Sequence, residues 1–483
     1  MRTARILSLS VLALIACSQA PSTAQNTSAD GAEFQLTQAA PIERRAPASR
    51  TEMQLSLAPV VRQVSPAVVN VYAQRVVRQR RSILDDMMRG VPPGALGGMS
   101  RERIEQSLGS GVIVRADGVI VTNNHVVEGA DALKVVLSDR REFEAKVIVA
   151  DPKTDLAVLR ITPGSERLPA LAFADTRQAE VGDLVIAIGN PFGLQQTVTS
   201  GIISALARTE VGINDFAFFI QTDAAINRGN SGGALVDMNG ALVGINTAIF
   251  SESGGSNGIG FAIPAEMVKR VVESALSSGS VVRPWLGVAA QPVTQDLARS
   301  LGLDRPRGVL VTELWSGGPA ERAGVQRGDV ILAVGGVDVF DEQAVRYQAA
   351  TQRPGATIPL RIVRGSAQRT VNARVDAPPR TPAPDPRDIA GENPMSGARV
   401  VALSPAAAEE AGLNPFSTGV YIQAMDARGT AARAGFRPGD VIRSVNGQRV
   451  RTGADLQRLL GAQTRWAIEV ERGGEVGTLN FGR

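Results

Sequence analysis

Short apolar runs separated by turn residues dominate the chain from residue 57 to about residue 280. Runs such as "AVVNVY", "ALKVVLSD" and "DLAVLRI" are rich in the β-branched residues that favour strands. Many short strands at this spacing are typical of antiparallel barrels or sandwiches. One helix closes the region, because Pro264 suits a first helical turn and Gly279 can end the helix. The pattern therefore predicts a mostly β domain over residues 57–280.

A repeated pattern follows residue 280. The segments 317–339 and 428–450 align without gaps, and about half of their positions are identical. A helix-like segment and then a strand-like run follow each copy, as in "IPLRIVRG" and "WAIEVERG". Two copies of one small α+β domain are therefore predicted, over 283–376 and 396–483. The proline-rich segment 377–395 between them is predicted to be an exposed linker.

The beginning of the chain predicts an export signal over residues 1–17. A basic start precedes an apolar run that is too short to span a membrane, and the run ends in "LIAC" at Cys17. This ending resembles a bacterial lipobox, in which the cysteine is lipidated and becomes the first residue of the mature chain. We expect lipidation at Cys17, with ordinary cleavage after Ala24 as the alternative. Residues 18–56 are then a flexible tether, and the lipid is the expected attachment to a membrane.

Composition narrows the chemistry that the chain can perform. The net charge is +4, from 51 basic and 47 acidic residues, so a dedicated basic face and a nucleic-acid partner are not expected. The sequence contains one histidine, His125, and one cysteine, Cys17. No metal site built from several histidines or cysteines is available, and we expect no metal and no cofactor. Any imidazole chemistry must use His125.

Ser231 stands in the glycine-rich segment "NRGNSGG" and is the candidate nucleophile. Serine needs a base to accept its proton and a third group to hold that base. The base can only be His125, in "VTNNHVVEG" at the end of an apolar strand. Asp155 opens an alternating strand in "DPKTDLAVLRI" and is favoured as the acid, with Asp151 as its rival. The order His125, Asp155, Ser231 matches that of the chymotrypsin-type triad.

The residues around Ser231 suit the transition state of acyl transfer. A tetrahedral oxyanion needs backbone N–H donors, and removal of one donor costs about 3–4 kcal/mol of barrier. The N–H groups of Gly229 and Ser231 form the expected oxyanion hole, with Asn230 shaping the turn. Gly232 and Gly233 are expected to let a substrate chain approach closely, because they carry no Cβ.

The segments "TNNHVV", "DPKTDLAVL", "GNPFG" and "QTDAAINRGNSGGALV", taken in this order, resemble the HtrA (Do-like) serine proteases, a chymotrypsin-fold family. The repeated domains resemble PDZ domains. The likeness covers residues 57–483. It implies a chymotrypsin-like double β-barrel protease domain followed by two α+β PDZ domains. It further implies an ATP-independent serine endopeptidase of the bacterial periplasm, which degrades unfolded or misfolded proteins in quality control and the stress response.

The same resemblance implies a small apolar substrate pocket, lined by Ile226, Ile249 and Phe250, and cleavage after small aliphatic residues. It implies a homotrimer and allows larger oligomers. A periplasmic chaperone or PDZ scaffold that holds clients without cutting them is the alternative. The presence of all three triad residues favours the enzyme, and chaperone activity can accompany it.

The first PDZ-like domain is expected to bind C-terminal peptides. By position, Trp285, Leu286, Gly287 and Val288 form its carboxylate-binding loop, in which Trp285 replaces the usual small or aliphatic residue. The second copy has "SGARVVALSP" at this place, a poor match, so strong peptide binding is not expected there.

Overall fold

The computed structural model describes residues 56–79, 101–190, 196–208, 218–227, 229–249, 257–461 and 463–482. The predicted signal peptide with Cys17, all but the last residue of the predicted tether, and Phe250 lie outside these described residues. Within the described ranges, no helix combines the length and the apolar character that a membrane crossing requires.

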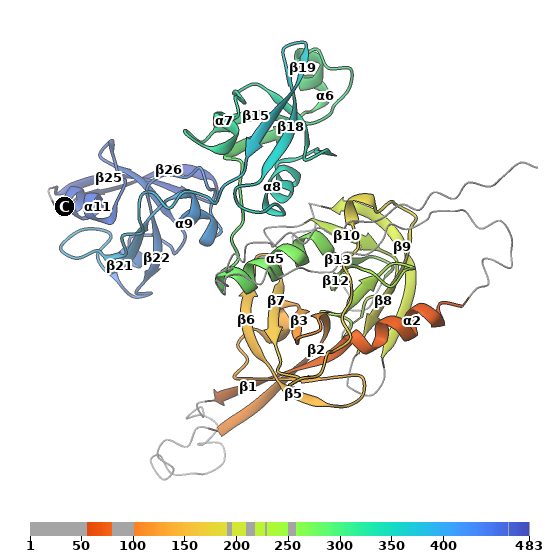
Figure 1. Ribbon diagram of the computed structural model, residues 1–483. Coiled ribbons are helices and arrows are strands. Elements are labelled where there is room, and N and C mark those ends of the chain that lie inside the picture. Colours follow the sequence, from red (N-terminus) through yellow and green to blue (C-terminus); the bar gives the residue numbers. More distant parts are fainter. Residues whose placement is uncertain are drawn as a thin grey trace, which may run out of the picture. The chain divides into compact units, whose positions relative to one another are not determined.

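The first half of the N-terminal β domain is an antiparallel sheet of seven strands (Figure 1). Their spatial order is β5-β4-β1-β2-β3-β7-β6. The helices α2 (Ala58–Val64) and η1 (Ser65–Ala67) precede the sheet, and the short helix α4 (Asn124–Val127) follows β3. The strands are β1 (Val68–Gln79), β2 (Arg101–Arg115), β3 (Val119–Thr122), β4 (Ala132–Val136), β5 (Glu142–Glu144), β6 (Lys146–Asp151) and β7 (Leu156–Arg160).

The second half of this domain is a closed barrel with the order β10-β13-β12-β11-β8-β9. Its buried strand residues are almost all apolar, as the continuous Val, Ile and Leu runs predict. The short helix η2 (Thr176–Gln178) precedes the barrel. The strands are β8 (Leu184–Gly189), β9 (Thr197–Arg208), β10 (Phe219–Thr222), β11 (Ala234–Val236), β12 (Leu242–Ile249) and β13 (Gly260–Pro264).

Helix α5 (Ala265–Ser278) closes the domain where the sequence predicts a helix. Pro264 is its N-cap residue, and Gly279 ends it in the left-handed conformation with φ of 66°. The apolar face of α5, which includes Val268, Val271 and Val272, is buried in the main core. The helix therefore belongs to the core of the β domain.

The first α+β domain has the strand order β14-β15-β16-β18-β19, with β17 paired to β16. Strand β14 forms one edge of the sheet, and α8 packs against it. The elements are β14 (Val288–Pro292), α6 (Gln295–Ser300), β15 (Val309–Leu314), α7 (Pro319–Arg322), β16 (Val330–Val334), β17 (Val337–Asp338), α8 (Glu342–Ala350), β18 (Thr357–Arg364) and β19 (Ala367–Arg374).

The second α+β domain repeats this plan with the order β20-β21-β22-β23-β25-β26, and β24 pairs with β23. Its strand β21 occupies the place that β14 has in the first copy. The elements are β20 (Arg387–Asp388), β21 (Ala398–Ala402), α9 (Pro405–Glu410), β22 (Val420–Met425), α10 (Thr430–Arg433), β23 (Val441–Val445), β24 (Gln448–Arg449), α11 (Gly453–Gly461), β25 (Arg465–Arg472) and β26 (Glu475–Gly482).

The segment predicted as a linker, 377–395, differs from that expectation in its second half. Strand β20 pairs with β21, and the Ile389 amide donates to the Ala398 carbonyl over 2.8 Å. The side chains of Ile389 and Met395 are buried in the core of the second α+β domain. These two apolar residues explain the difference, because an exposed linker would leave them in water.

The shared "GDVI" sequence of the two copies has a structural reason. In the first copy the buried Asp329 carboxylate accepts hydrogen bonds from the Gln326 amide and from the Arg364 guanidinium, which lies 2.7 Å away. In the second copy Asp440 has an equivalent pair with Arg472 at 2.6 Å. Each copy therefore neutralises one buried carboxylate with an arginine from the long hairpin that follows.

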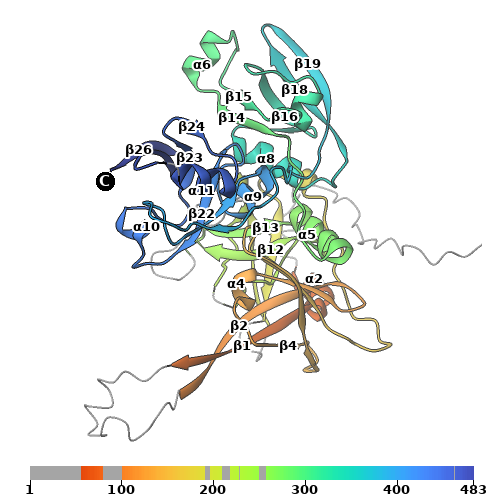
Figure 2. The same ribbon diagram turned by 90° about the vertical axis from the view of Figure 1, so that its left-hand side faces the viewer.

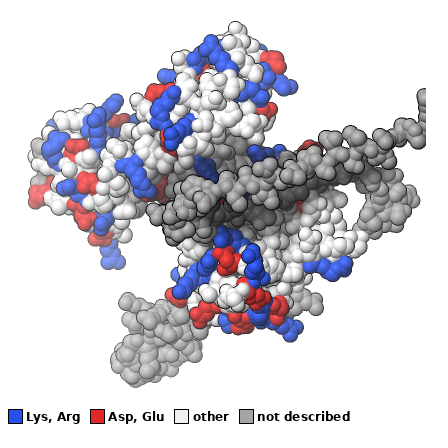
Figure 3. Space-filling model, viewed as in Figure 1, with Lys and Arg blue, Asp and Glu red and all other residues white. Residues whose placement is uncertain are grey.

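Charged side chains of both signs are mixed on the face of the molecule that Figure 3 shows. Basic and acidic residues alternate over the described parts of all three domains, and neither sign forms a continuous field on this face. The drawn surface therefore matches the near balance of charge in the sequence.

Candidate active site

His125 and Asp155 lie in contact at one end of the first sheet. Helix α4, which carries His125, packs against β1 and β2 (Figure 2). His125 Nδ1 lies 2.8 Å from Asp155 Oδ2, and the His125 amide donates to Asp155 Oδ1 over 3.0 Å. The Asp155 side chain is 15% exposed, whereas that of His125 is 49% exposed. The carboxylate is thus largely shielded from water, whereas the imidazole is about half exposed.

The backbone of Asp155 is fixed by the segment that precedes His125. Asp155 has φ of 55°, in the left-handed region that is uncommon for residues other than glycine. The Asn123 side-chain amide and the Asn124 backbone amide both donate to the Asp155 carbonyl, over 2.9 Å and 3.0 Å. The two asparagines of "TNNH" therefore hold Asp155 in the orientation that lets its carboxylate meet the imidazole.

Asp151, the rival acid, has different partners. Its buried carboxylate accepts a hydrogen bond from the Thr154 hydroxyl and forms an ion pair with Arg283. The side chains of Asp151 and Arg283 are 7% and 10% exposed, so the pair is largely removed from water. The structure brings Asp155, and not Asp151, against His125.

Thr247 is a site residue that the sequence reasoning missed. Its hydroxyl donates to Asp155 Oδ2 over 2.6 Å, and its backbone carbonyl accepts from Ser231 Oγ at 3.1 Å. Thr247 lies on β12 of the barrel, so it joins the acid of the sheet to the serine of the barrel. The sequence offers one indication of this role, because Asn246 and Thr247 are polar residues within the apolar run "GALVGINTAIF".

Ser231 lies in a turn that is hydrogen-bonded to Ser110 of β2. The Ser110 amide donates to the Ser231 carbonyl over 2.9 Å, and the Ser110 hydroxyl donates to the Gly229 carbonyl over 2.5 Å. Ser110 is itself fully buried and accepts from the Asn190 amide at 2.8 Å. The strand from the sheet thus sets the position of the serine turn of the barrel.

The amides of this turn differ in their hydrogen bonding. The Asn230 amide donates to the Asn227 carbonyl over 3.0 Å and is used within the turn. Gly229 has φ of 103°, a conformation that glycine reaches without strain. Among the described residues, the amides of Gly229 and Ser231 donate no hydrogen bond. These are the two donors that the sequence assigns to the oxyanion.

The glycines after Ser231 serve a different purpose from the one expected. A Cβ on Gly232, where φ is 81°, would lie 2.1 Å from the Ser110 carbonyl oxygen. A Cβ on Gly233 would lie 2.3 Å from the Ile188 carbonyl oxygen. Both spaces are filled by the protein's own strands, so these glycines allow the serine turn to pack against β2 and β8. The expectation that they make room for a substrate chain is not supported.

Ser231 and His125 are not hydrogen-bonded to each other in this structure, since the Ser231 hydroxyl donates to the Thr247 carbonyl. Catalytic hydrogen bonds are often long in ligand-free enzymes and tighten only when substrate binds. The structure therefore brings His125 and Asp155 into contact, and the Ser231 hydroxyl is bonded to the backbone of β12.

The predicted substrate-pocket residues are only partly described. Ile226 is buried and belongs to the core cluster of the barrel that also contains Ala224 and Ala262. Its side chain lies 2.6 Å from the position of a Cβ on Gly260, so a larger residue at 260 would displace it. Ile249 ends β12, where its backbone pairs with Gly260. Phe250 lies outside the described residues.

The predicted carboxylate-binding loop leads into β14. The Trp285 amide donates to the Asp376 carbonyl over 3.0 Å, which closes the loop at its start. Leu286 is buried, Gly287 has φ of 69°, and Val288 begins β14. The loop is therefore followed directly by the free edge of the sheet.

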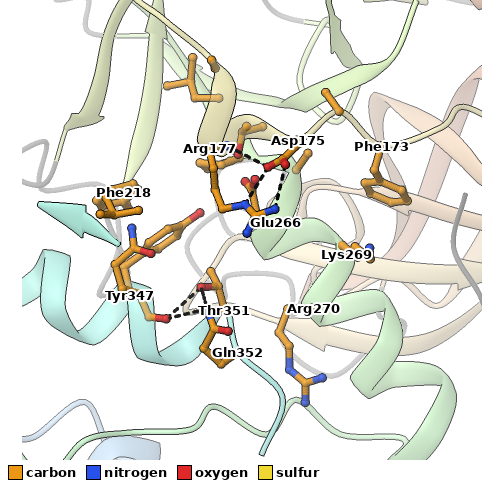
Figure 4. Close-up of a pocket in the computed structure, with 18 of the residues that line it drawn as sticks. Phe173, Asp175, Arg177, Phe218, Glu266, Lys269, Arg270, Tyr347, Thr351 and Gln352 are labelled. Atoms are coloured by element: carbon orange, nitrogen blue, oxygen red, sulfur yellow. Dashed lines mark hydrogen bonds and ion pairs between the residues drawn. The ribbon is translucent and has the colours of Figure 1, made fainter. Parts of the chain in front are cut away.

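A pocket of about 550 Å³ lies apart from the candidate triad, and none of the three triad residues lines it (Figure 4). Asp175 and Arg177 form hydrogen bonds of 2.8 Å there, and these bonds lower the pKa of Asp175. The rings of Phe218 and Tyr347 stack with their centroids 3.9 Å apart. Burial raises the pKa of Glu266 to about 7, and its Oε1 has no hydrogen-bond partner among the described residues.

Comparison with known families finds three matching regions. Residues 109–245 match the trypsin-like peptidase domain, and residues 284–375 and 421–472 each match a PDZ domain. The first match contains all three residues of the candidate triad. These matches confirm the predicted fold class of a trypsin-like protease domain followed by two PDZ domains.

Whole-chain comparison gives relatives of the same kind. A protein of Chlamydia trachomatis named probable periplasmic serine endoprotease DegP-like is 45% identical over 73% of this chain and 69% of its own length. A Brucella suis protein of the same name is 44% identical over 73% of this chain and 68% of its own length. The solved structure of the HtrA-type protease AlgW with decapeptide is 43% identical, with a TM-score of 0.51, over 67% of this chain and 99% of that one.

Proposed function

Because this chain belongs to the HtrA (DegP-like) family of serine endoproteases, and is a serine endopeptidase, we propose that Ser231 is its nucleophile, His125 its general base and Asp155 the acid that orients His125. The contact of 2.8 Å between His125 Nδ1 and Asp155 Oδ2 is the observation that supports these roles most directly. It fixes the tautomer in which Nδ1 carries the proton and Nε2 is free to accept one.

The first half of the reaction is acylation of the serine. Ser231 Oγ attacks the scissile carbonyl carbon while His125 Nε2 takes the hydroxyl proton, and the carbonyl electron pair moves onto its oxygen. The amides of Gly229 and Ser231, which donate no hydrogen bond to another described residue, stabilise that oxyanion. When the tetrahedral intermediate collapses, the C–N bond breaks and His125 returns the proton to the leaving amine.

The second half regenerates the enzyme. Water gives a proton to His125 and attacks the acyl carbon, and collapse of this second intermediate returns the proton to Ser231 Oγ. Thr247 assists both halves, because its hydroxyl bond of 2.6 Å to Asp155 keeps that carboxylate turned toward the imidazole.

The proposed substrates are unfolded or misfolded polypeptides, cleaved after small aliphatic residues. Ile226 is buried beside Ala224 and Ala262, and these apolar surroundings support a preference for apolar over charged side chains near this position. A charged side chain would lose its hydration there without a compensating partner, and a large ring would be too bulky for a small pocket. Peptides with Val or Ala before the cleaved bond should therefore be hydrolysed faster than those with Lys or Phe.

The proposed setting is the periplasm, with the chain anchored by a lipid at Cys17 and assembled as a homotrimer or a larger oligomer. The "LIAC" sequence and the names of the DegP-like relatives support the location. A quality-control role follows from this setting, and chaperone activity would accompany proteolysis. Replacement of Cys17 by serine should release the protein from the membrane fraction.

The first PDZ domain is proposed to bind the C-termini of client chains. Its edge strand β14 and the loop Trp285–Val288 support this role. In the second PDZ domain the corresponding strand β21 is already paired with β20 at Arg399 and Val400, so this part of its edge is occupied.

Casein cleavage by the Ser231→Ala variant tests the proposed reaction. The variant should lose cleavage, keep its binding of unfolded casein and still slow the aggregation of an unfolded client. Ser300→Ala, at an exposed position on α6, is the matched control and should cleave like the wild type. Cleavage that survives in Ser231→Ala would place the nucleophile elsewhere.

A further inference from the structure

The first PDZ domain contains a groove between β14 and α8. Strand β14 is the edge of its sheet, so a peptide can add to it as a further antiparallel strand. Leu286, Val288 and Val345 are buried or nearly buried apolar residues that line this groove. Among the described residues, the amides of Leu286 and Gly287 donate no hydrogen bond, and they stand where β14 begins. They are suited to receive a terminal carboxylate.

The register of such a peptide follows from the strand geometry. A carboxylate at the loop places the last residue of the peptide beside Val288, and antiparallel pairing then places the third residue from the end beside Ala290. The side chains of Val288 and Ala290 are buried in the same core as Val345 and Ala349 of α8. Because strand side chains alternate, the last and third-last residues of the peptide point toward α8.

Glu342 lies beside Ala290, where the third-last residue of the peptide would bind. It is the first residue of α8, and its Oε2 lies 3.5 Å from the Ala290 backbone nitrogen. It is half-buried and lines the groove together with Arg346, one turn further along the helix. The Glu342 carboxylate therefore lies beside the third-last residue of a bound peptide. An apolar residue at position 342 would instead favour an apolar peptide side chain there.

We propose that the first PDZ domain selects C-terminal peptides that carry lysine or arginine at the third position from the end, through Glu342. This inference rests on the proposed peptide binding at this groove and names its preferred ligand. A basic side chain would give a charge-assisted hydrogen bond to a partly desolvated carboxylate. An acidic side chain at the same place would be repelled.

The neighbouring charges set the size of the effect. Asp341 precedes Glu342 and adds negative potential, whereas Arg346 opposes it. Burial of Glu342 raises its pKa, which shows that water compensates its charge incompletely. A hydrogen bond between such a group and a charged donor contributes enough for an affinity difference of about tenfold.

Fluorescence anisotropy with the full chain tests the proposal, in the Ser231→Ala background so that the peptides are not cleaved. Three labelled peptides end in valine and differ only at the third-last residue, which is lysine, glutamine or glutamate. The lysine peptide should bind about tenfold more tightly than the glutamine peptide, and the glutamate peptide most weakly. A lysine peptide with an amidated C-terminus should lose most of its affinity.

Glu342→Gln keeps the shape of the side chain and should bring the lysine and glutamine peptides within about twofold of each other. Glu313→Gln is the matched control, because Glu313 is exposed on β15 and pairs with Ala289 rather than Ala290. It should keep the full preference. Arg346→Ala removes the opposing cation and should increase the preference for lysine.

Pro415 and Phe416 of the second PDZ domain also line this pocket, and the Phe416 ring centroid lies 6.2 Å from that of Trp285. Phe416→Ala should therefore strengthen the binding of all three peptides without changing their order. If no peptide binds even to this variant, the groove proposal is overturned.

Equal affinities of the three peptides, or a lysine preference that persists in Glu342→Gln, would overturn the proposed selectivity alone. Casein cleavage by the wild-type chain, measured in parallel, reports on the proposed peptidase reaction. A failure of peptide selection and a failure of that reaction can therefore be told apart.

Discussion

Two aspartates at the ends of one turn, Asp151 and Asp155, have the same side chain but different surroundings. Asp155 accepts hydrogen bonds from the His125 amide and the Thr247 hydroxyl and faces the imidazole Nδ1. Asp151 is buried against the permanently charged Arg283. Asp155 is thus held in place by two neutral donors, and it lies beside an imidazole, which can gain and lose a proton. Asp151 is neutralised by a cation that cannot lose its charge, and it is suited to holding the chain together.

The partners of each acid, rather than its place in the motif, therefore decide its role. Both residues belong to the segment "DPKTD", and both lie at the border of a strand. The catalytic proposal for Asp155 therefore predicts effects on rate, and the ion pair of Asp151 predicts effects on stability. Four changes test this division, beginning with the largest expected effect.

Asp155→Asn should lower kcat by about 10⁴-fold, because the amide favours the wrong imidazole tautomer and cannot stabilise the imidazolium. The melting temperature should change little, since the amide keeps the volume of the side chain. Hydrolysis of a fluorogenic valine peptide and thermal unfolding measure the two quantities. A loss of less than tenfold would contradict the orienting role of Asp155.

Asp151→Ala should destabilise the folded chain by about 3–5 kcal/mol, because it leaves Arg283 buried without its partner. The rate per folded molecule should stay within about twofold of the wild type. Denaturant unfolding and active-site titration measure these effects. The double variant Asp151→Leu, Arg283→Met removes both charges and should regain most of the stability, and failure to do so would show that the pair itself is not the cause.

Glu266 is an acid of a third kind. Its carboxyl group is removed from water by burial, and the nearby Arg177 compensates this loss only weakly. Its pKa in the folded chain is about 7, above the ordinary value of 4.5. The stability that the protonated form contributes is fully present below about pH 4.5 and is lost as the pH rises through about 7. The wild type should therefore lose roughly 3 kcal/mol between these limits.

Glu266→Gln should remove this pH dependence. The variant and the wild type should have similar stability near pH 4, and the variant should be the more stable of the two at pH 8. Melting curves recorded from pH 4 to pH 8 measure the difference. Parallel curves for the two proteins would contradict the raised pKa.

Thr247→Val should have the smallest effect, a loss of about tenfold in kcat, because a hydrogen bond to a charged group contributes about 1.5 kcal/mol. Valine keeps the shape of the side chain and the backbone carbonyl that Ser231 contacts. Thr370→Val on the exposed face of β19 is the control and should be neutral. An unchanged rate in Thr247→Val would mean that the backbone amide and His125 suffice to hold Asp155.

Local patterns predicted much of this molecule. The apolar runs identified the strands, Gly279 correctly marked the end of α5, and the repeated "GDVI" segments identified two related domains. The candidate site was predicted because few residues can perform its chemistry. The sequence contains a single histidine, so only His125 can serve as an imidazole base. The contact between His125 and Asp155 then needed only the correct choice between two nearby acids.

What the sequence did not predict depends on contacts between distant segments. Thr247 contacts Asp155 across 92 positions of the chain, and no local pattern identifies such a partner. Gly232 is required by the Ser110 carbonyl, which belongs to the other half of the domain. Residues 387–395 have the composition of a linker, yet Ile389 and Met395 become buried once β20 pairs with β21.

In the proposed reaction, Ser231 is made reactive by His125 and Asp155. Treatment of the full chain with a serine-directed phosphonate, followed by mass spectrometry of its peptides, tests this claim most directly. We expect one modified residue, Ser231, with labelling that slows by orders of magnitude in Asp155→Asn and remains fast in folded Asp151→Ala. Modification of another residue, or equal labelling of Ser231 with and without Asp155, would contradict it.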